Sequence, residues 1–272
     1  MMEGLLAAPG DWSGDVAGWL GLAAASFIAG AVNSVAGGGT IIAFPVLAAI
    51  LPADPARMVT ANATSTVGLW PGAVAAAWAY RGERIAEPTW TRHLLGPSFA
   101  GAAAGAGLVF LLPAHWFDAL VPWLILGAAV MFAAQPRLAT WTFGRGTGRL
   151  PAAGAGVAQF LVALYGGYFG AGIGILMLAV LGLLGIGDIH RPNGVKNALA
   201  AAINGTAATL FAVGSFGGLH DVSWLHAGVM AVTGTAGAVV AARLARRLPG
   251  TIVRRIIAVI GFALAAKFFL RP

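Results

Sequence analysis

Two glycine-rich stretches decide how this chain folds: AGAVNSVAGGGT at residues 29–40 and GGYFGAGIG at residues 166–174. Each runs into a short apolar segment, 39–51 in the first case and 171–186 in the second. As ideal helices these segments would rise only about 20–24 Å, whereas the hydrocarbon core of a bilayer is about 30 Å thick. The sequence therefore predicts two short apolar helices, each opened by a glycine break.

The composition indicates that lipid surrounds this fold. Of 272 residues, 59% are hydrophobic and 9% are charged, against about 45–50% and about 25% in soluble domains. So few charges cannot cover a surface in water, which predicts a polytopic membrane protein made of helices. The chain has no cysteine, which excludes disulfides and thiolate metal sites. The net charge of +7 comes from short basic clusters between apolar runs, so it indicates topology and not nucleic-acid binding.

Hydropathy predicts ten apolar spans and an internal duplication. The spans are expected at 15–36, 39–51, 57–80, 93–112, 116–134, 150–169, 171–186, 193–216, 222–242 and 251–270. Each short segment follows a long span and precedes a long span with a polar start, which predicts two copies of one unit. We therefore expect an all-α polytopic membrane protein with two inverted repeats of about five spans each. The first repeat is expected at 1–136, a cytoplasmic linker at 137–149 and the second repeat at 150–272.

Charged residues predict the orientation of the repeats. With the N-terminus outside and ten crossings, the inner loops hold all but three of the 16 basic residues; the exceptions are Arg57, Lys267 and Arg271. Six of the nine acidic residues then fall outside. This balance favours a crossing by every short segment over a re-entrant path. We expect a multi-pass protein of the cell inner membrane with both termini outside and the linker inside.

The polar residues at membrane depth gather around the two glycine breaks. A glycine-rich bend at the start of a half-helix exposes backbone N–H groups beside a positive dipole end, which can hold an anion without a formal charge. Lys196 is the cation placed to add attraction from the inner side. The candidate substrate-binding residues are Asn33, Gly37, Gly38, Gly39, Thr40, Asn62, Thr64, Ser65, Gly170, Gly172, Gly174, Lys196, Asn197 and Asn204.

These candidates also have a structural interpretation. Glycine runs serve as packing contacts in membrane helices, and Asn62 and Asn197 can crosslink helices through amide hydrogen bonds. Lys196 can extend to the inner interface as a topology signal. From the residues alone, the choice between substrate binding and packing stays open.

The sequence predicts neither a catalytic nor a metal site. It contains no HExxH motif and no carboxylate pair at membrane depth, and its five histidines lack ligand spacing. We therefore expect no enzyme activity and no cofactor. A non-transporting membrane scaffold is an alternative, although it does not explain the duplicated breaks. The expected partners are a small anion, the lipid bilayer and, as an open alternative, a second copy of the chain.

The residues around both breaks resemble those of a known family. Residues 29–40, followed by Phe44-Pro45 and the run 61–65, are similar to the N-terminal signature of the sulfite exporter TauE/SafE family. Residues 166–174 and the run 195–197 are similar to its C-terminal signature, except that Ala171 and Ile173 interrupt the second glycine triplet. The resemblance covers nearly the whole chain. It implies a permease for sulfur-containing anions, with sulfite export as the first expectation and transport of an organosulfonate or another small oxoanion, inward or outward, as the alternative.

Overall fold

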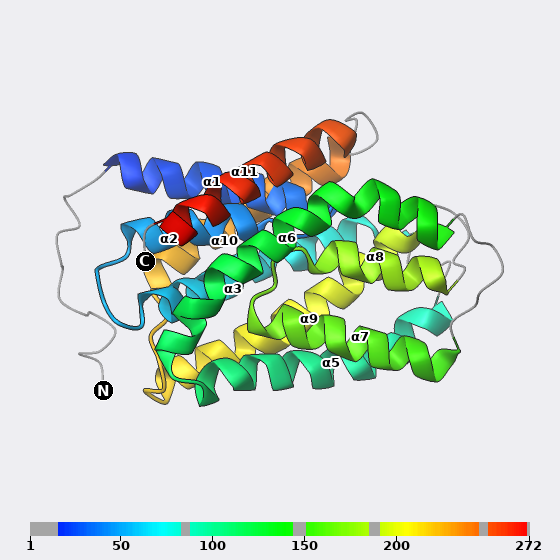
Figure 1. Cartoon of the computed structure of the whole chain (residues 1–272), viewed down its shortest axis with the longest axis horizontal. Helices are drawn as coiled ribbons and strands as arrows, with labels where there is room; N and C mark the ends of the chain where they lie inside the picture. Colours follow the sequence, from blue (N-terminus) through cyan, green and yellow to red (C-terminus); the bar gives the residue numbers. More distant parts are fainter. Residues whose placement is uncertain (1–15, 83–87, 144–150, 185–190, 245–249, 271–272) are drawn as a thin grey trace.

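The computed structural model describes residues 16–82, 88–143, 151–184, 191–244 and 250–270, which form a bundle of helices (Figure 1). No strand occurs in these ranges. The helices are α1 (Val16–Val35), α2 (Thr40–Ile50), α3 (Arg57–Ala79), α5 (Pro88–Leu111), α6 (Ala114–Phe143), α7 (Ala152–Tyr168), α8 (Ile173–Leu183), α9 (Arg191–Phe216), α10 (Trp224–Leu244) and α11 (Gly250–Leu270).

Each predicted span coincides with one of these helices. The largest difference is at α6, which continues through Pro136 to Phe143. A proline inside a membrane helix removes one backbone hydrogen bond without ending the helix. The first part of the expected 137–149 linker is therefore helical, and its remaining residues from 144 lie outside the described ranges.

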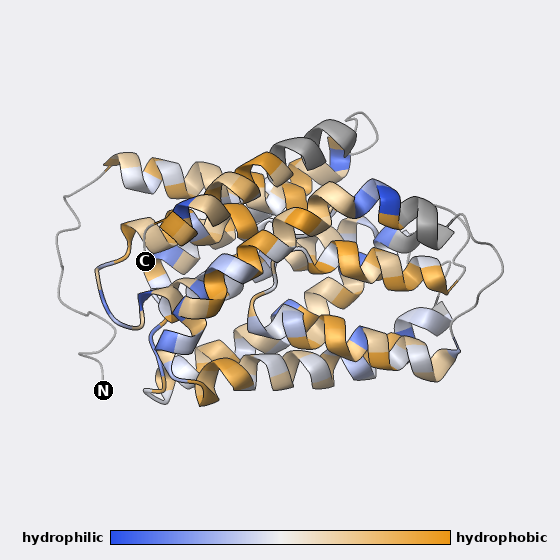
Figure 2. Cartoon of the chain, in the orientation of Figure 1, coloured by the Kyte–Doolittle hydropathy of each residue, from blue (hydrophilic) through white to orange (hydrophobic). Residues whose placement is uncertain are grey.

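The surface of the bundle is apolar over most of its length (Figure 2). Large hydrophobic side chains are exposed on it, for example Val232 at 73%, Val213 at 62% and Leu161 at 58%. A surface of this kind is stable where lipid covers it. Five of the described helices, α1, α5, α6, α9 and α10, contain segments long and apolar enough to cross a bilayer. The chain is therefore a multi-pass membrane protein.

The two short helices turn back along the helices before them (Figure 1). A Cβ at Gly39, at the start of α2, would overlap the backbone of Ala29 in α1, and α8 packs on α7. With 11 residues each, α2 and α8 rise about 16 Å and cannot cross a core of about 30 Å. The expectation of ten crossings is wrong on this point, because each short helix forms a re-entrant hairpin with its predecessor.

The hairpins leave the sides of all later helices unchanged. In Figure 1, the start of α1 and the end of α11 lie at one end of the bundle, while the end of α6 and the start of α7 lie at the opposite end. A re-entrant hairpin returns the chain to the side of the membrane from which it entered, and two successive crossings do the same. The later loops therefore stay on the sides that the charges predict. Residues 1–15 and 271–272, to which the expectation of outside termini refers, lie outside the described ranges.

Close helix pairs hold the hairpins at the centre of the bundle. α1 packs on α10 and α7 packs on α5, while α3 and α9 contact each other between these pairs and α6 packs on α11. Glycines make the closest contacts: a Cβ at Gly101 or Gly105 would overlap the backbone of α7, and one at Gly30 would overlap that of α10. Small residues let membrane helices approach this closely.

Candidate substrate site at the two glycine breaks

Each hairpin turns through glycines with a left-handed backbone. φ is +74° at Gly37 and +111° at Gly38 in the first break, and +79° at Gly170 and +78° at Gly172 in the second. Residues with a β-carbon rarely adopt these angles. The glycines therefore allow the chain to fold back on itself within a few residues.

The two breaks touch each other. A Cβ at Gly37 would lie 2.5 Å from the Cα of Gly174, and a Cβ at Gly38 would lie 2.6 Å from the backbone nitrogen of Gly172. These distances leave no room for a side chain in a close-packed interior. The starts of α2 and α8 thus lie against each other with only backbone between them.

A small cavity lies beside this contact. Its volume is about 20 Å³, enough for roughly one water molecule. It is lined by Asn33, Gly37, Gly38, Thr40, Ala73, Gly170, Ile173, Gly174, Lys196, Asn197, Ala200 and Asn204. The structure therefore brings most of the candidate residues to one place. The candidates that do not line the cavity are Gly39, Asn62, Thr64, Ser65 and Gly172.

Lys196 is the charged residue of this cavity, and it is fully buried. Its Nζ donates hydrogen bonds to the carbonyl oxygens of Ser34 (3.4 Å) and Val35 (3.1 Å), at the end of α1. A cation is stabilised there because the carbonyls at a helix C-terminus carry a partial negative charge. The alternative in which Lys196 extends to the inner interface is wrong, because its side chain has no exposed surface.

Asn62 and Asn197 each donate a hydrogen bond to the hairpin in the other half of the chain. Asn62 Nδ2 donates to the carbonyl of Tyr168, at the end of α7 (2.9 Å), and Asn197 Nδ2 donates to the carbonyl of Ser34, near the end of α1 (3.1 Å). Both asparagines are buried. The bonds are crosslinks between helices, in agreement with the structural interpretation of these residues, and Asn197 also lines the cavity.

The backbone N–H groups differ between the two breaks. In the first, Oδ1 of Asn33 accepts hydrogen bonds from the N–H groups of Gly38 (2.8 Å) and Gly39 (2.6 Å), so a side chain already fills the expected anion cradle. In the second, no hydrogen bond within the described part of the chain uses the N–H groups of Ile173 and Gly174. The start of α8 is therefore the break that offers open donors and a positive dipole end.

Two further candidates connect helices away from the cavity. Thr64 Oγ1 accepts a hydrogen bond from the N–H of Ser223, which precedes α10 (2.9 Å). Ser65 Oγ donates to the carbonyl of Asn62 in the preceding turn (3.1 Å). These contacts fix the position of α3 and show no path from either hydroxyl to the cavity.

Ala73, Ile173 and Ala200 line the cavity but cannot be found by a search for polar residues. Helical spacing could have indicated one of them, Ala200. Asn197, Ala200 and Asn204 follow at i, i+3 and i+7 and therefore share one face of α9.

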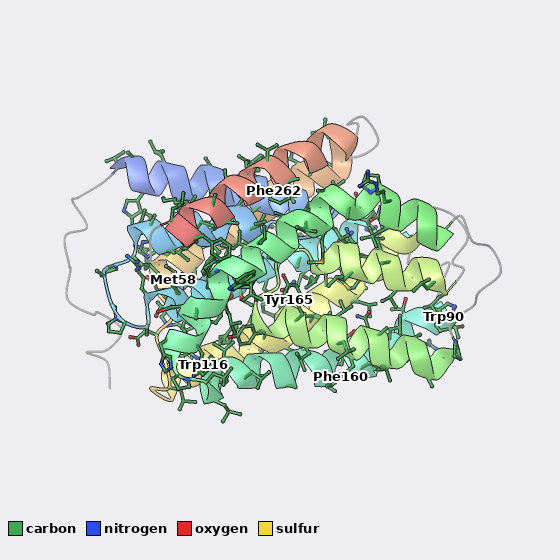
Figure 3. The ribbon with its side chains drawn as sticks, in the orientation of Figure 1. Met58, Trp90, Trp116, Phe160, Tyr165 and Phe262 are labelled. Carbon is green, nitrogen blue, oxygen red and sulfur yellow. The ribbon has the colours of Figure 1, made fainter. Side chains whose placement is uncertain are left out.

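Tyr165 supports the second break and is also missing from the candidates. Its hydroxyl donates a 2.6 Å hydrogen bond to the carbonyl of Ala171, within the turn between α7 and α8. Figure 3 shows Tyr165 near the middle of the bundle, whereas Trp90 and Trp116 lie toward opposite ends. The turn between α7 and α8 is therefore held near the middle of the bundle.

The chemistry of the cavity comes from amide groups, a threonine hydroxyl, one ammonium group and backbone N–H groups. Among the residues that the structure describes, no three His, Cys, Asp or Glu side chains lie together as a metal site would require. Hydrogen-bond donors beside a cation are suited to the oxygens of a small oxoanion.

The profile of one protein family matches the chain from residue 22 to residue 268, which includes both hairpins. The chain belongs to the sulfite exporter TauE/SafE family. The family resemblance of the two glycine-rich signatures is thereby confirmed, and the TauE/SafE match extends from α1 to α11.

Relatives of this TauE/SafE protein are described as transporters. It is 28% identical over 250 residues to a probable membrane transporter protein, ORF9, of a Sinorhizobium species, covering 91% of each chain. It is 27% identical to a probable membrane transporter protein of Haemophilus influenzae, covering 89% of this chain and 90% of the relative. It is 26% identical to the probable membrane transporter protein YfcA of Escherichia coli K12, covering 89% and 86%. No solved structure matches the chain. The protein is a membrane transporter of the TauE/SafE family.

Proposed function

We propose that this transporter is an inner-membrane permease for a small sulfur-containing oxoanion, with sulfite export as its main reaction. One observation carries the proposal: a fully buried lysine lines the cavity where two half-helix starts meet. A buried cation is costly in a membrane protein and marks substrate or ion pathways. Transport of an organosulfonate or another small oxoanion, in either direction, is the alternative for the same site.

The two halves of the chain are inferred to be inverted repeats, in which α1, α2, α3, α5 and α6 correspond in order to α7, α8, α9, α10 and α11. With this correspondence, the pair α1–α10 matches α7–α5, and α3–α10 matches α9–α5. The crosslinks also match, because Asn62 binds Tyr168 and Asn197 binds Ser34. Equivalent contacts at equivalent positions support a two-fold axis in the membrane plane, as in other inverted-repeat transporters.

Substrate binding requires the cavity to widen, because a volume of about 20 Å³ holds roughly one water and no oxoanion. Lys196, the Thr40 hydroxyl and the N–H groups of Ile173 and Gly174 then supply donors to the anion's oxygens. Separation of the breaks widens the cavity, since only backbone contact joins them. Opening toward each side in turn carries the anion across, and a membrane potential that is negative inside favours outward movement.

Flux of radiolabelled sulfite into proteoliposomes tests this function. The wild-type protein should carry sulfite above the rate of empty liposomes, and unlabelled organosulfonates and other oxoanions should compete according to their affinity. A lack of protein-dependent flux for every anion in this panel would contradict the proposal.

Asn33→Asp is the sharpest variant for the location of the site. An aspartate oxygen can still accept the hydrogen bonds from Gly38 and Gly39, but it places a negative charge on the cavity lining. We expect normal folding, measured by thermal unfolding in detergent, and a loss of sulfite flux of about tenfold or more, which corresponds to about 1.4 kcal/mol. Unchanged flux would place the substrate elsewhere.

A further inference from the structure

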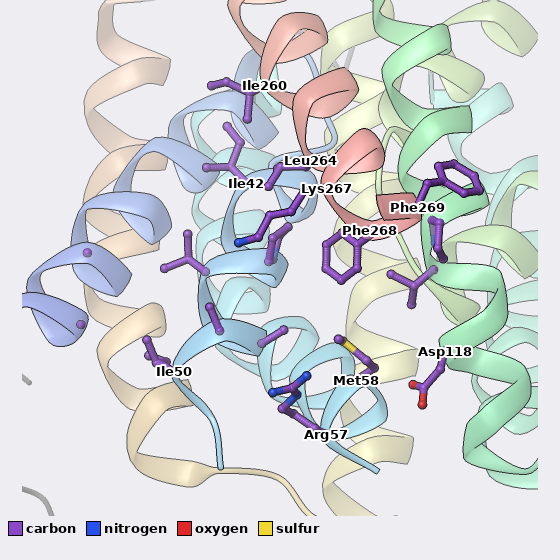
Figure 4. Close-up of a pocket in the computed structure, with 18 of the residues that line it drawn as sticks. Ile42, Ile50, Arg57, Met58, Asp118, Ile260, Leu264, Lys267, Phe268 and Phe269 are labelled. Atoms are coloured by element: carbon purple, nitrogen blue, oxygen red, sulfur yellow. The ribbon is translucent and has the colours of Figure 1, made fainter. Parts of the chain in front are cut away.

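A second and much larger cavity lies away from the glycine breaks. It is a groove of about 1240 Å³, larger than the roughly 300–1,000 Å³ of most small-ligand pockets. Residues of α1, α2, α6 and α11 and of the start of α3 line it, with α2 between α1 and α11 (Figure 4). Its lining shares no residue with the cavity at the breaks. The groove therefore has room for a ligand far larger than an oxoanion.

Most of the groove is apolar, with a lining that includes Ile42, Pro45, Val46, Leu264 and Phe268. It lies where two helices of the bundle pack only loosely: α6 packs along α8, whereas α11 touches α2, the helix that corresponds to α8, much less. In a bilayer the solvent of such a surface is the acyl chain of a lipid.

Charged side chains of both signs line the groove; Figure 4 shows Arg57 and Asp118 toward one end, and Lys267 between this end and Ile260. Arg57 and Lys267 supply two cations, and Asp54 and Asp118 supply two anions. In the described ranges no ion pair joins these four side chains. The positive-inside rule does not account for the cations, because they belong to the end where α3 begins and α11 ends, opposite to the basic residues that follow α3 and end α10.

We propose that this groove is a binding site for one phospholipid whose zwitterionic head group carries a primary ammonium. Arg57 and Lys267 bind the phosphate, since guanidinium and ammonium groups are strong donors to phosphate oxygens. Asp54 and Asp118 accept hydrogen bonds from the lipid ammonium, which a quaternary choline cannot donate. Two cations and two anions sum to zero, so the site matches a zwitterion better than an anionic lipid. The acyl chains lie on α2 between α1 and α11.

Native mass spectrometry tests the head-group assignment on the full chain. Purified protein is offered phosphatidylethanolamine, phosphatidylcholine and phosphatidylglycerol at equal concentration. We expect phosphatidylethanolamine to be retained about tenfold more than either competitor, which corresponds to about 1.4 kcal/mol. Equal retention of the three lipids, or a preference for phosphatidylglycerol, would overturn the head-group assignment.

The double variant Arg57→Gln, Lys267→Gln tests the residues. It should lose the preference for phosphatidylethanolamine. The matched control is Arg81→Gln, which removes a cation that lies outside the groove, exposed and stacked 3.8 Å above the Trp78 ring, and it should keep the preference. A double variant that binds the lipids as the wild type does would overturn the proposal.

A steric variant keeps the proposal testable if the double variant does not fold. Gly21 lines the groove, and a Cβ there would meet no atom within 4 Å. Gly21→Phe should therefore fill the groove and displace the lipid without strain in the protein. Gly228→Phe is the control, because Gly228 is equally open but lies outside the groove. Equal lipid retention by both variants would overturn the site. Because no substrate is present, the outcome is independent of the transport function.

Discussion

Lys196 combines two features that are each costly in lipid: a formal charge and complete burial. Its hydrogen bonds to the carbonyls of Ser34 and Val35 compensate for part of that cost. The same ammonium group lines the cavity. A single side chain thus stabilises the end of α1 and provides a positive charge where the two hairpins meet.

Substitution of Lys196 should impair transport more than folding. Lys196→Gln retains a donor but loses the charge, and a hydrogen bond to a charged group is worth about 1.5–3 kcal/mol, which corresponds to roughly a tenfold to hundredfold lower affinity. Lys196→Arg should also be impaired, since a planar guanidinium is wider than an ammonium group and the site has no spare volume. Sulfite affinity from the concentration dependence of flux measures both effects. Wild-type affinity in Lys196→Gln would remove this residue from the site.

His220, between α9 and α10, makes stability depend on pH. Its ring stacks on Phe110 at a centroid distance of 4.2 Å, and burial lowers its pKa below the ordinary 6.5, against smaller opposite effects of Leu219 and Asp221. The unfolded chain therefore binds a proton more readily than the folded protein, so stability is present above about pH 6.5 and is lost as the pH falls below it. The Tm should decrease from about pH 7 to about pH 5, and less so in His220→Phe. Identical slopes in the two proteins would contradict this account.

At the scale of the helices, Gly37 combines a left-handed backbone with the contact to Gly174, and two variants separate these requirements. Gly37→Ala introduces a Cβ at a φ of +74° and 2.5 Å from the Cα of Gly174. Gly218→Ala introduces one at a φ of +72° in open space. The backbone conformation alone should cost about 1–2 kcal/mol. Gly37→Ala should lower the free energy of unfolding further and reduce sulfite flux, whereas Gly218→Ala should leave flux unchanged. Equal effects of the two variants would mean that the contact between the breaks is unimportant.

Hydropathy was sufficient to predict the helices, but not the path of the hairpins. Lipid tolerates only segments that satisfy their own backbone hydrogen bonds, so long apolar runs reliably become helices. The side of each loop depends on whether the number of preceding crossings is even or odd. Two full crossings leave the chain on the same side of the membrane as one hairpin does. The charges around Arg81 and Arg243 therefore fit both paths. The length of α2 and α8 was the better signal, because 11 residues cannot cross the core.

The candidate site was predictable in its location and less so in its chemistry. Glycine runs and neighbouring amides indicated the region in which the structure has a small polar cavity, because few polar groups are tolerated within the membrane. The sequence could not show that the carboxamide of Asn33 occupies the N–H groups of the first break, since this depends on the geometry of one turn. It also could not separate Asn62, which only crosslinks, from Asn197, which crosslinks and lines the cavity.

For the whole molecule, the positive-inside rule predicts which end of the bundle faces the cytoplasm. The chain has no cysteine, so single cysteines report their side without background. Ala53→Cys, between α2 and α3, should react with a membrane-impermeant maleimide in intact cells. Gly82→Cys, after α3, should react only once the membrane is opened; both positions are exposed. The reverse pattern would contradict the proposed orientation.

The reciprocal crosslinks have a consequence for how the polypeptide can be divided. The carbonyls that end α1 are bound by Lys196 and Asn197, and the carbonyl that ends α7 is bound by Asn62. A fragment ending after Phe143 would leave the carbonyls of α1 without these partners, and the remaining fragment would leave the carbonyl of α7 without Asn62. In hydrocarbon each unsatisfied group costs several kcal/mol. Either fragment expressed alone should be degraded, whereas co-expression of both should restore a complex that an affinity tag on one fragment recovers intact. A stable single fragment would show that the hairpins do not depend on each other.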